Sequence, residues 1–156
     1  MQDTLRRRWR GTLAFALLQL PLIWLVALRY TPYLAVPDDP MGVAYLVLTW
    51  IGHFGMLALL GWLPLGVLAL LLKARWLWLP AALLGALGLC ALLLDTVVYA
   101  QYRFHVNYFM VSLFLNDENG EIFSFTTSTW LVVIGCVLLA LALEGWLAQR
   151  LIAGGR

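Results

Sequence analysis

The sequence predicts an all-α protein: a polytopic bundle of four transmembrane helices, with an interfacial helix between the third and the fourth. Of the 156 residues, 63% are hydrophobic and only 12% are charged, which is unusually apolar for a soluble domain of this size. Four segments carry almost no charge over the roughly 20 helical residues that cross a hydrocarbon core of about 30 Å. The basic residues gather at the ends of these segments. We therefore expect a single membrane domain over residues 1–156.

The first predicted helix covers about residues 11–28 and follows the basic sequence LRRRWRG. A basic start before an apolar stretch is also typical of a secretory signal peptide. This stretch is longer than a signal core, and no small-x-small cleavage site follows it, so we expect an uncleaved anchor. The next connection contains Pro32, Pro37 and Pro40, which predicts turns rather than a strand.

The second and third predicted helices cover about residues 43–72 and 76–100 and are joined by a tight turn at KAR. The second is longer than one crossing requires, which favours a tilt, a kink near Pro64 or a first turn at the membrane surface. The third contains GALGLC, in which Gly85 and Gly88 form a small-residue face suited to close helix approach.

A link of about residues 101–127 separates the third helix from the fourth. From Tyr102 to Leu115, aromatic and aliphatic residues are interspersed with polar ones, which favours a helix lying at the membrane interface. The sequence NDENGE then predicts a polar turn.

The fourth predicted helix covers about residues 129–147, and Thr127 or Ser128 is available as its N-cap. Its acid, Glu144, lies near the end of the helix, so we expect it to pair with a cation or to extend toward the headgroups. Gln19, in the middle of the first helix, is expected to make an interhelical hydrogen bond.

The distribution of basic residues predicts the orientation in the membrane. Only Arg29 and Arg103 fall on the side opposite to the two termini. The other eight fall on the side of the termini: Arg6, Arg7, Arg8, Arg10, Lys73, Arg75, Arg150 and Arg156. By the positive-inside rule, both termini are then cytoplasmic. In a bacterium, we expect a multi-pass protein of the inner membrane whose opposite face is periplasmic.

Asp95 lies inside the third apolar segment and needs a partner, because an ionisable group in a membrane helix costs roughly 2.5–3.5 kcal/mol. His53 on the neighbouring helix lies at a similar depth, and Arg29 reaches this level with its long side chain. We therefore expect a cluster of Arg29, His53 and Asp95, with Arg103 as the competing partner of the acid. This cluster either only joins three helices or forms the floor of an outward-facing pocket for a lipid headgroup.

Several functional classes find no support in the sequence. His53, His105 and Asp95 lack metal-ligand spacing such as H-x-x-x-H, and no carboxylate pair indicates acid–base catalysis. We expect no catalytic residue, metal or cofactor. The net charge of +2 comes mostly from arginines near the helix ends, which favours contact with anionic lipids over nucleic-acid binding.

Three segments together resemble a known family. They are IGHF at residues 51–54, LLLDTVVYAQYRFHVN at residues 92–107 and LFLNDENGE at residues 113–121. In this order and spacing they resemble the N-terminal membrane domain of the YejM (PbgA) inner-membrane proteins, which belong to the sulfatase and alkaline-phosphatase superfamily. The matched positions are His53, Asp95, His105 and Asn107. Gln101 stands where the family has a basic residue, and Arg103 lies close by.

This resemblance implies an integral membrane domain that acts in lipopolysaccharide and outer-membrane lipid homeostasis. It implies contact with lipopolysaccharide or cardiolipin, and with a membrane protein partner such as a protease adaptor. The fifth helix, the basic segment and the hydrolase-like domain of the family have no counterpart in this sequence, so we expect no inherited enzymatic activity.

The sequence thus predicts a non-catalytic membrane module. Two alternatives remain open: a small membrane enzyme or proton-linked transporter that uses Asp95, and a structural subunit of a larger membrane complex. The candidate lipid- and partner-binding residues are Arg29, His53, Asp95, Arg103, His105 and Asn107.

Overall fold

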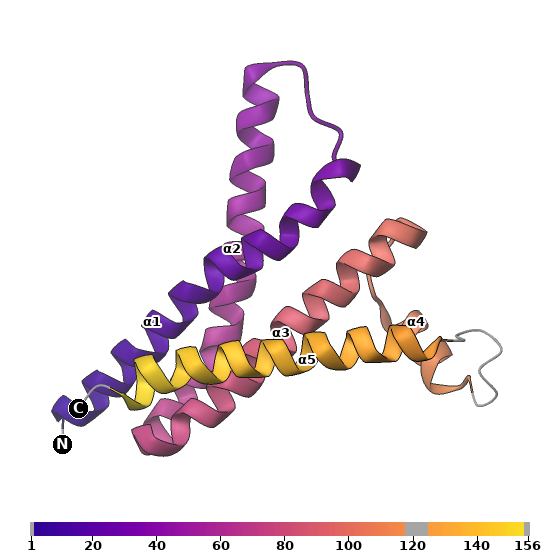
Figure 1. Cartoon of the computed structure of the whole chain (residues 1–156). Coiled ribbons are helices and arrows are strands. Elements are labelled where there is room, and N and C mark those ends of the chain that lie inside the picture. Colours follow the sequence, from indigo (N-terminus) through magenta and orange to yellow (C-terminus); the bar gives the residue numbers. More distant parts are fainter. Residues whose placement is uncertain (1, 118–124, 155–156) are drawn as a thin grey trace.

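The computed structural model describes residues 2–117 and 125–154, and within these ranges every regular element is a helix (Figure 1). Four of the helices are long and apolar enough to cross a membrane. The predicted all-α fold with four membrane-capable helices is therefore confirmed. These helices are α1 (Gln2–Ala27), α2 (Pro40–Leu71), α3 (Ala74–Tyr102) and α5 (Thr127–Ala148).

Three shorter elements complete the described chain. A 3₁₀ helix, η1 (Leu28–Tyr33), continues α1, and a π-helical turn, η2 (Gln149–Ala153), continues α5. A separate short helix, α4 (Tyr108–Leu115), lies between α3 and α5. As predicted, the connection from α1 to α2 contains no strand, and α2 and α3 are joined by a tight turn.

The long helices extend beyond the apolar segments that predicted them. α1 begins at Gln2 rather than near residue 11, so the arginine-rich start of the chain is helical. α2 begins at Pro40 and continues through Pro64 as one helix. The lack of charged residues locates only the part of a helix that lies in the hydrocarbon core. The helix itself continues into the charged flanks as long as its backbone hydrogen bonds are made.

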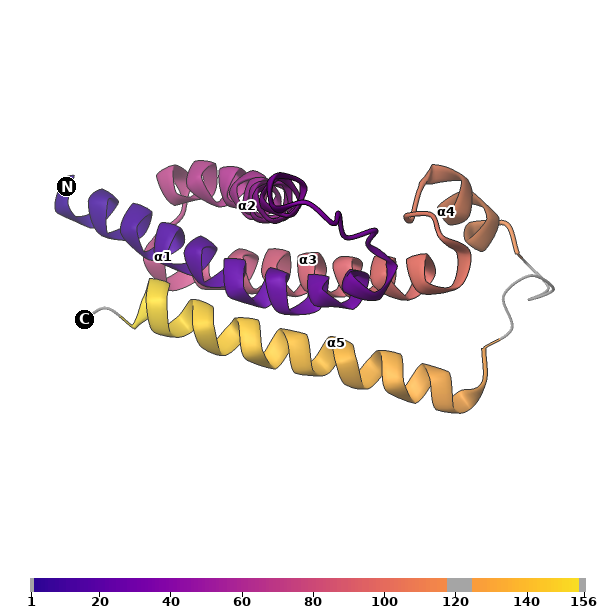
Figure 2. The ribbon, with the colours of Figure 1, turned by 90° about the horizontal axis from the view of Figure 1, so that it is seen from above.

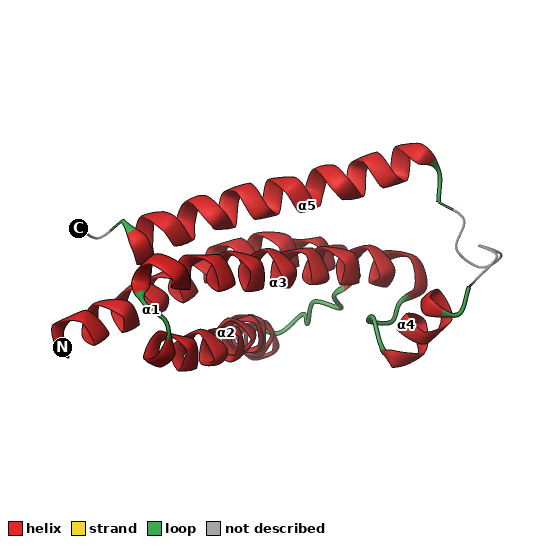
Figure 3. Cartoon of the chain, turned by 90° about the horizontal axis from the view of Figure 1, so that it is seen from below, coloured by secondary structure: helices red, strands yellow, loops and turns green. Residues whose placement is uncertain are grey.

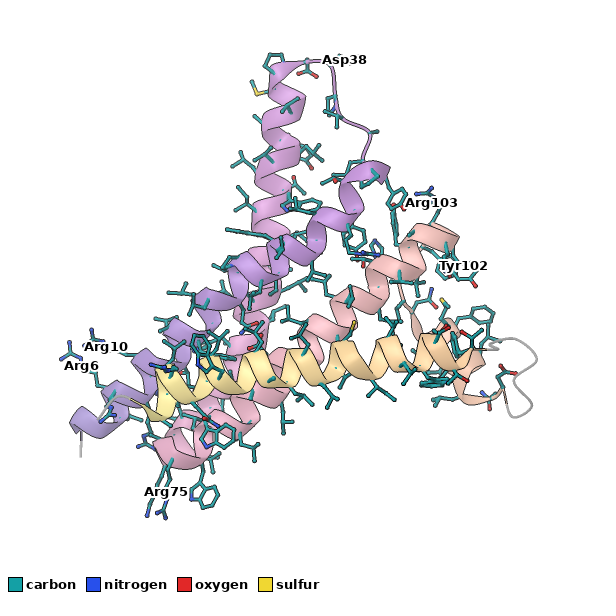
Figure 4. The ribbon with its side chains drawn as sticks, viewed as in Figure 1. Arg6, Arg10, Asp38, Arg75, Tyr102 and Arg103 are labelled. Carbon is teal, nitrogen blue, oxygen red and sulfur yellow. The ribbon has the colours of Figure 1, made fainter. Side chains whose placement is uncertain are left out.

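The helices form three layers. α1 and α3 make the middle layer, α2 covers one face of this pair and α5 covers the other (Figures 2 and 3). Both termini and the α2–α3 turn lie at one end of the bundle, which we call the arginine-rich end because Arg6, Arg10 and Arg75 gather there (Figure 4). From this end α2 and α3 diverge toward the opposite, distal end (Figure 1).

Packing is closest near the arginine-rich end, where small residues let the helices approach one another. Arg8 Nη1 donates a hydrogen bond to the Leu72 carbonyl at the end of α2, at 2.5 Å. The last carbonyls of a helix have no partner within the helix, so this bond joins the α2–α3 turn to α1. The buried core here consists of Phe15, Leu65, Ala69, Leu77, Ala81, Ala82, Ala148 and Ile152.

Gly11 brings α1 against the last turn of the chain. A Cβ atom on Gly11 would lie 2.8 Å from the Leu151 carbonyl oxygen and 3.3 Å from Ile152 Cα. These are backbone atoms of η2, which cannot turn aside as a flexible side chain can. The absence of a side chain at Gly11 is therefore what permits this contact.

The connection after α3 differs from its prediction. The expected helix from Tyr102 to Leu115 is shorter, because α3 continues to Tyr102 and α4 begins only at Tyr108. Arg103 has a left-handed backbone (φ 62°), which ends α3 and reverses the chain. That α4 lies at the membrane interface stays a prediction. Most of the expected NDENGE turn lies outside the described residues.

The N-cap of α5 lies one residue earlier than expected. The Thr126 hydroxyl accepts a hydrogen bond from the Thr129 amide at 3.3 Å, so Thr126 is the cap rather than Thr127 or Ser128. Residues 126–129 all carry a hydroxyl group, and only the extended backbone conformation at Thr126 distinguishes it as the cap.

Replacing Gly11 with leucine should destabilise the bundle by about 1–3 kcal/mol, the usual range for overpacking, because the new side chain collides with the η2 backbone. Thermal unfolding of the purified protein in detergent measures this change. Gly52→Leu is the matched control, since a Cβ atom at Gly52 meets nothing within 4 Å. Equal melting temperatures for the two variants would contradict the close contact.

Candidate functional site

Asp95, near the distal end of α3, accepts three hydrogen bonds. Its Oδ2 accepts from the Tyr30 hydroxyl and lies 2.6 Å from His105 Nδ1, and its Oδ1 accepts from the Val106 amide at 2.6 Å. Tyr30 belongs to η1, whereas His105 and Val106 follow α3. One partly buried carboxylate therefore joins the end of the first helix, the third helix and the link that leaves it.

The local backbone explains why His105 reaches back to Asp95. The left-handed conformation of Arg103 turns the chain directly after α3, so the next residues run back along the last turns of the helix. Asn107 then caps α4, because its Oδ1 accepts from the Met110 amide at 3.1 Å. The short segment from Arg103 to Asn107 is thus held at both ends.

Aromatic rings surround these hydrogen bonds. Tyr99 stacks on the His105 ring with centroids 4.8 Å apart, and Tyr30 meets Tyr99 edge to face at 5.4 Å. Tyr30 also stacks on Phe54 of α2 at 6.4 Å. We call Tyr30, Asp95, Tyr99 and His105 the distal cluster. Aromatic contacts of this kind add to the hydrogen bonds in fixing the position of the His105 ring.

The arginines predicted to pair with Asp95 have other partners. Arg29 Nε donates to the Thr96 hydroxyl at 3.0 Å, one residue beyond the acid. The Arg103 guanidinium lies 3.9 Å from the centroid of the Tyr33 ring, at the distal end (Figure 4). The expected ion pairs of Asp95 with Arg29 or Arg103 are therefore wrong. Both cations nevertheless lie beside elements of the distal cluster.

His53 also has a different role from the expected one. Its ring meets Phe54 edge to face at 5.2 Å, and Phe54 in turn contacts Tyr30. Among the described residues, His53 makes no hydrogen bond to Asp95. It faces the same hollow as Asp95 and His105, so the structure does bring these three predicted residues to one place.

Two partners in this region were not found from the sequence. Tyr30 donates to Asp95, and Thr96 accepts from Arg29. Each is an ordinary residue for the end of a membrane helix. A signal for the Asn107 cap was present, since an asparagine before a short apolar helix is a typical N-cap. No signal in the sequence distinguishes Tyr30 from the other distal tyrosines, because its contact with Asp95 spans 65 residues.

A groove of about 580 Å³ continues from the distal cluster into the bundle between α2 and α3, with α1 as its floor. Its distal mouth is polar and is formed by Tyr30, His53, Asp95 and His105. Below the mouth the walls are mainly apolar. The groove ends at Phe15 and Leu65, where the core of the arginine-rich end begins.

Glu144 on α5 forms a second polar pair, which is fully buried. Its Oε2 accepts from Gln19 Nε2 at 2.6 Å, whereas its Oε1 has no partner among the described residues. Arg150 lies over the Trp146 ring instead. The predicted ion pair or extension to the surface is therefore wrong, and the predicted interhelical bond of Gln19 is confirmed. Gly85 makes room for the acid, since a Cβ atom there would lie 2.6 Å from Oε2.

The chemistry of the distal cluster suits the binding of an anion. Because Asp95 Oδ2 is an acceptor, His105 Nδ1 carries the hydrogen between them. Nε2 is then the nitrogen left for a ligand, and it donates to an anion when the ring is protonated to the imidazolium. The His105 side chain is 66% exposed, whereas that of Asp95 is only 19% exposed. The acid is thus covered by its donors while the imidazole is presented outward. Within residues 2–117 and 125–154, no group of three or more His, Cys, Asp or Glu side chains is placed to hold a metal ion.

A family model described as "Domain of unknown function (DUF3413)" matches residues 1–154. The match covers nearly the whole chain, including all residues of the distal cluster and the groove. No curated protein matches the sequence.

Replacing Asp95 with alanine should loosen the segment after α3, because the Val106 amide and His105 lose their acceptor. A hydrogen bond to a charged group contributes about 1.5–3 kcal/mol, so amide hydrogen exchange at Val106 should become roughly tenfold faster or more. Mass spectrometry of the exchanged protein measures this rate. Asp38→Ala, an exposed acid at the distal end, should leave it unchanged (Figure 4). Unchanged exchange in the Asp95 variant would refute the role of the carboxylate.

Proposed function

The chain belongs to the DUF3413 family, and we propose that it is a non-catalytic membrane module that binds the headgroup of an anionic lipid at the distal cluster. In this proposal it also contacts a membrane protein partner and acts in the control of lipopolysaccharide and outer-membrane lipid homeostasis. The membrane is the bacterial inner membrane, with the arginine-rich end and both termini in the cytoplasm.

The observation that carries the proposal is the exposed His105 ring at the mouth of the groove. Asp95 already accepts three hydrogen bonds from the protein, so its charge is compensated before any ligand arrives. The exposed ring can then meet a phosphate without strong repulsion from the acid behind it. A site in which the carboxylate faced outward would instead repel an anionic headgroup.

Two arginines add positive charge to the distal end near this mouth, although neither lines the groove itself. Arg29 is held beside the cluster by Thr96, and Arg103 is held over Tyr33, whose ring contacts Tyr99 at 5.9 Å. Guanidinium groups suit phosphate because their hydrogen-bond donors match its oxygens. Phosphate groups are shared by cardiolipin, phosphatidylglycerol and lipopolysaccharide, so this chemistry selects a class of lipid.

The resemblance to the YejM membrane domain supports the finer part of the proposal. Its matched residues His53, Asp95 and His105 face one groove, and Asn107 caps the helix that follows. Residues that form one binding site must lie close together in space, as these matched residues do. The DUF3413 match is compatible with this resemblance.

The partner of this module is proposed to bind along α5. This helix packs mainly against α3 and forms an outer layer of the bundle (Figures 2 and 3). Many of its leucine and valine side chains are exposed, which gives it a wide apolar face. A membrane-embedded helix of a protease adaptor is the partner that the family resemblance suggests. Proton-linked transport through Asp95 is the weaker alternative, because all three donors around the acid are protein groups.

Neutralising the distal mouth should weaken binding of phosphatidylglycerol in detergent micelles. His105→Gln combined with Arg29→Gln removes the two proposed charge-assisted contacts, and at about 1.5–3 kcal/mol each the dissociation constant should rise about a hundredfold or more. Arg75→Gln is the control, since this arginine lies at the arginine-rich end over Trp76 (Figure 4). Equal binding by both variants would overturn the headgroup site.

The cellular part of the proposal has its own test. Lipopolysaccharide per cell is measured in a strain that lacks this gene, and again after the wild-type chain or the double variant is restored. Restoration by the wild-type chain and by Arg75→Gln, but not by a stably expressed double variant, is the expected result. No change of lipopolysaccharide in any strain would refute the link to lipid homeostasis while leaving the binding result intact.

A further inference from the structure

We propose that the groove between α2 and α3 holds one acyl chain of the lipid whose headgroup lies at the distal cluster. This inference rests on the proposed function and extends it, because it assigns the apolar part of the same ligand. The protein would then bind both the headgroup and an acyl chain of one lipid, rather than a phosphate group alone.

The length of the groove matches one leaflet of a bilayer. On α3 its lining extends from Asp95 at the mouth to Leu84 at the inner end, which is about 16 Å at 1.5 Å per helical residue. A hydrocarbon core is about 30 Å thick, so this is roughly the depth of one leaflet. A lipid of the distal leaflet can therefore place its head at the mouth while its chain follows the groove inward.

The order of polar and apolar residues along the groove is that of a lipid. The polar mouth is followed by the side chains of Leu57, Ala58, Leu89 and Leu92, and the inner end is closed by Phe15. Gln19 also lines the groove below the mouth, and its amide nitrogen donates to Glu144. The groove opens beside helices whose outer faces are exposed leucine and valine, so the medium next to it is hydrocarbon rather than water. In a membrane, the molecules next to an apolar groove at this depth are lipids, so an acyl chain is the group that enters it.

Two glycines keep the groove open. Gly61 on α2 and Gly88 on α3 both line it, and a Cβ atom at either position meets nothing within 4 Å. Gly85, at the inner end, differs from them because a Cβ atom there would meet Glu144 and Phe15. The space in front of Gly61 and Gly88 is therefore unfilled by the protein, and a larger side chain there would occupy the place of the acyl chain without a collision.

Photocrosslinking tests this assignment. The full chain is reconstituted in phosphatidylcholine vesicles that contain phosphatidylglycerol with a diazirine group in the middle of one acyl chain. After irradiation, mass spectrometry should locate adducts on the groove residues Leu57, Ala58 and Leu89. Adducts only on the outward face of α5, as expected for lipid that merely surrounds the protein, would overturn the proposal.

Variants that fill the groove provide the second arm. Gly88→Leu should reduce the groove adducts about tenfold, which corresponds to a loss of roughly 1.4 kcal/mol in binding. Gly61→Leu places the leucine on the α2 wall, opposite Gly88, and should reduce the groove adducts to the same extent. The proposal therefore remains testable if one variant folds poorly. Gly55→Leu and Gly135→Leu are matched controls: each has open space at its Cβ and neither lines the groove.

The outcomes separate this inference from the proposed function. If Gly88→Leu and Gly61→Leu keep the groove adducts of the wild type while His105→Gln with Arg29→Gln weakens phosphatidylglycerol binding, the headgroup site stands and the acyl-chain site is refuted. If the groove-filling variants lose the adducts but the headgroup variant binds normally, the proposed headgroup site fails and only a chain-binding groove remains. If wild-type protein gives no groove adducts, the acyl-chain assignment is overturned irrespective of the headgroup result.

Discussion

The hydrogen bonds of Asp95 determine the arrangement of the distal half of the molecule. In hydrocarbon, an unpaired carboxylate is costly, and an isolated backbone amide after a helix end is also unfavourable. Both are satisfied together when the Val106 amide and the His105 ring turn back onto the acid. The Tyr30 hydroxyl then ties the end of the first helix to the same atoms. The position of α4, the exposure of His105 and the polar mouth of the groove all follow from this one carboxylate.

The two ends of the bundle are stabilised by different means. Near the arginine-rich end, alanine and glycine residues allow close backbone contact, so close packing is the main interaction between the helices, and the Arg8–Leu72 hydrogen bond adds to it. Toward the distal end the helices diverge, and polar and aromatic contacts replace close packing. Between them lies a stretch in which neither mechanism fills the space, and this is where the groove is found. Its location is therefore a consequence of helices that diverge from one closely packed end.

The sequence was sufficient to predict the helices and the interhelical hydrogen bond of Gln19, but not the partners of the acids. Length and lack of charge locate a membrane helix because the bilayer acts on each segment independently. The partner of Asp95 depends on where the chain reverses at Arg103, and a left-handed arginine has no sequence signal. Glu144 was expected to find the nearest cation, yet helix geometry directs it inward to Gln19. His53 and Asp95 were predicted in one cluster with Arg29, and both line the groove, although no predicted bond among the three is present.

The Gln19–Glu144 bond can form only late in the synthesis of the chain. The two residues are 125 positions apart, and a ribosome adds about 5–20 residues per second, so Gln19 is made about 6–25 s before its partner. During that interval the first three helices can associate, but α1 and α3 present a face with an uncovered amide. Insertion of the last helix brings the acid that covers it. The side-chain amide of Gln19 therefore gains this acceptor only once α5 is in place.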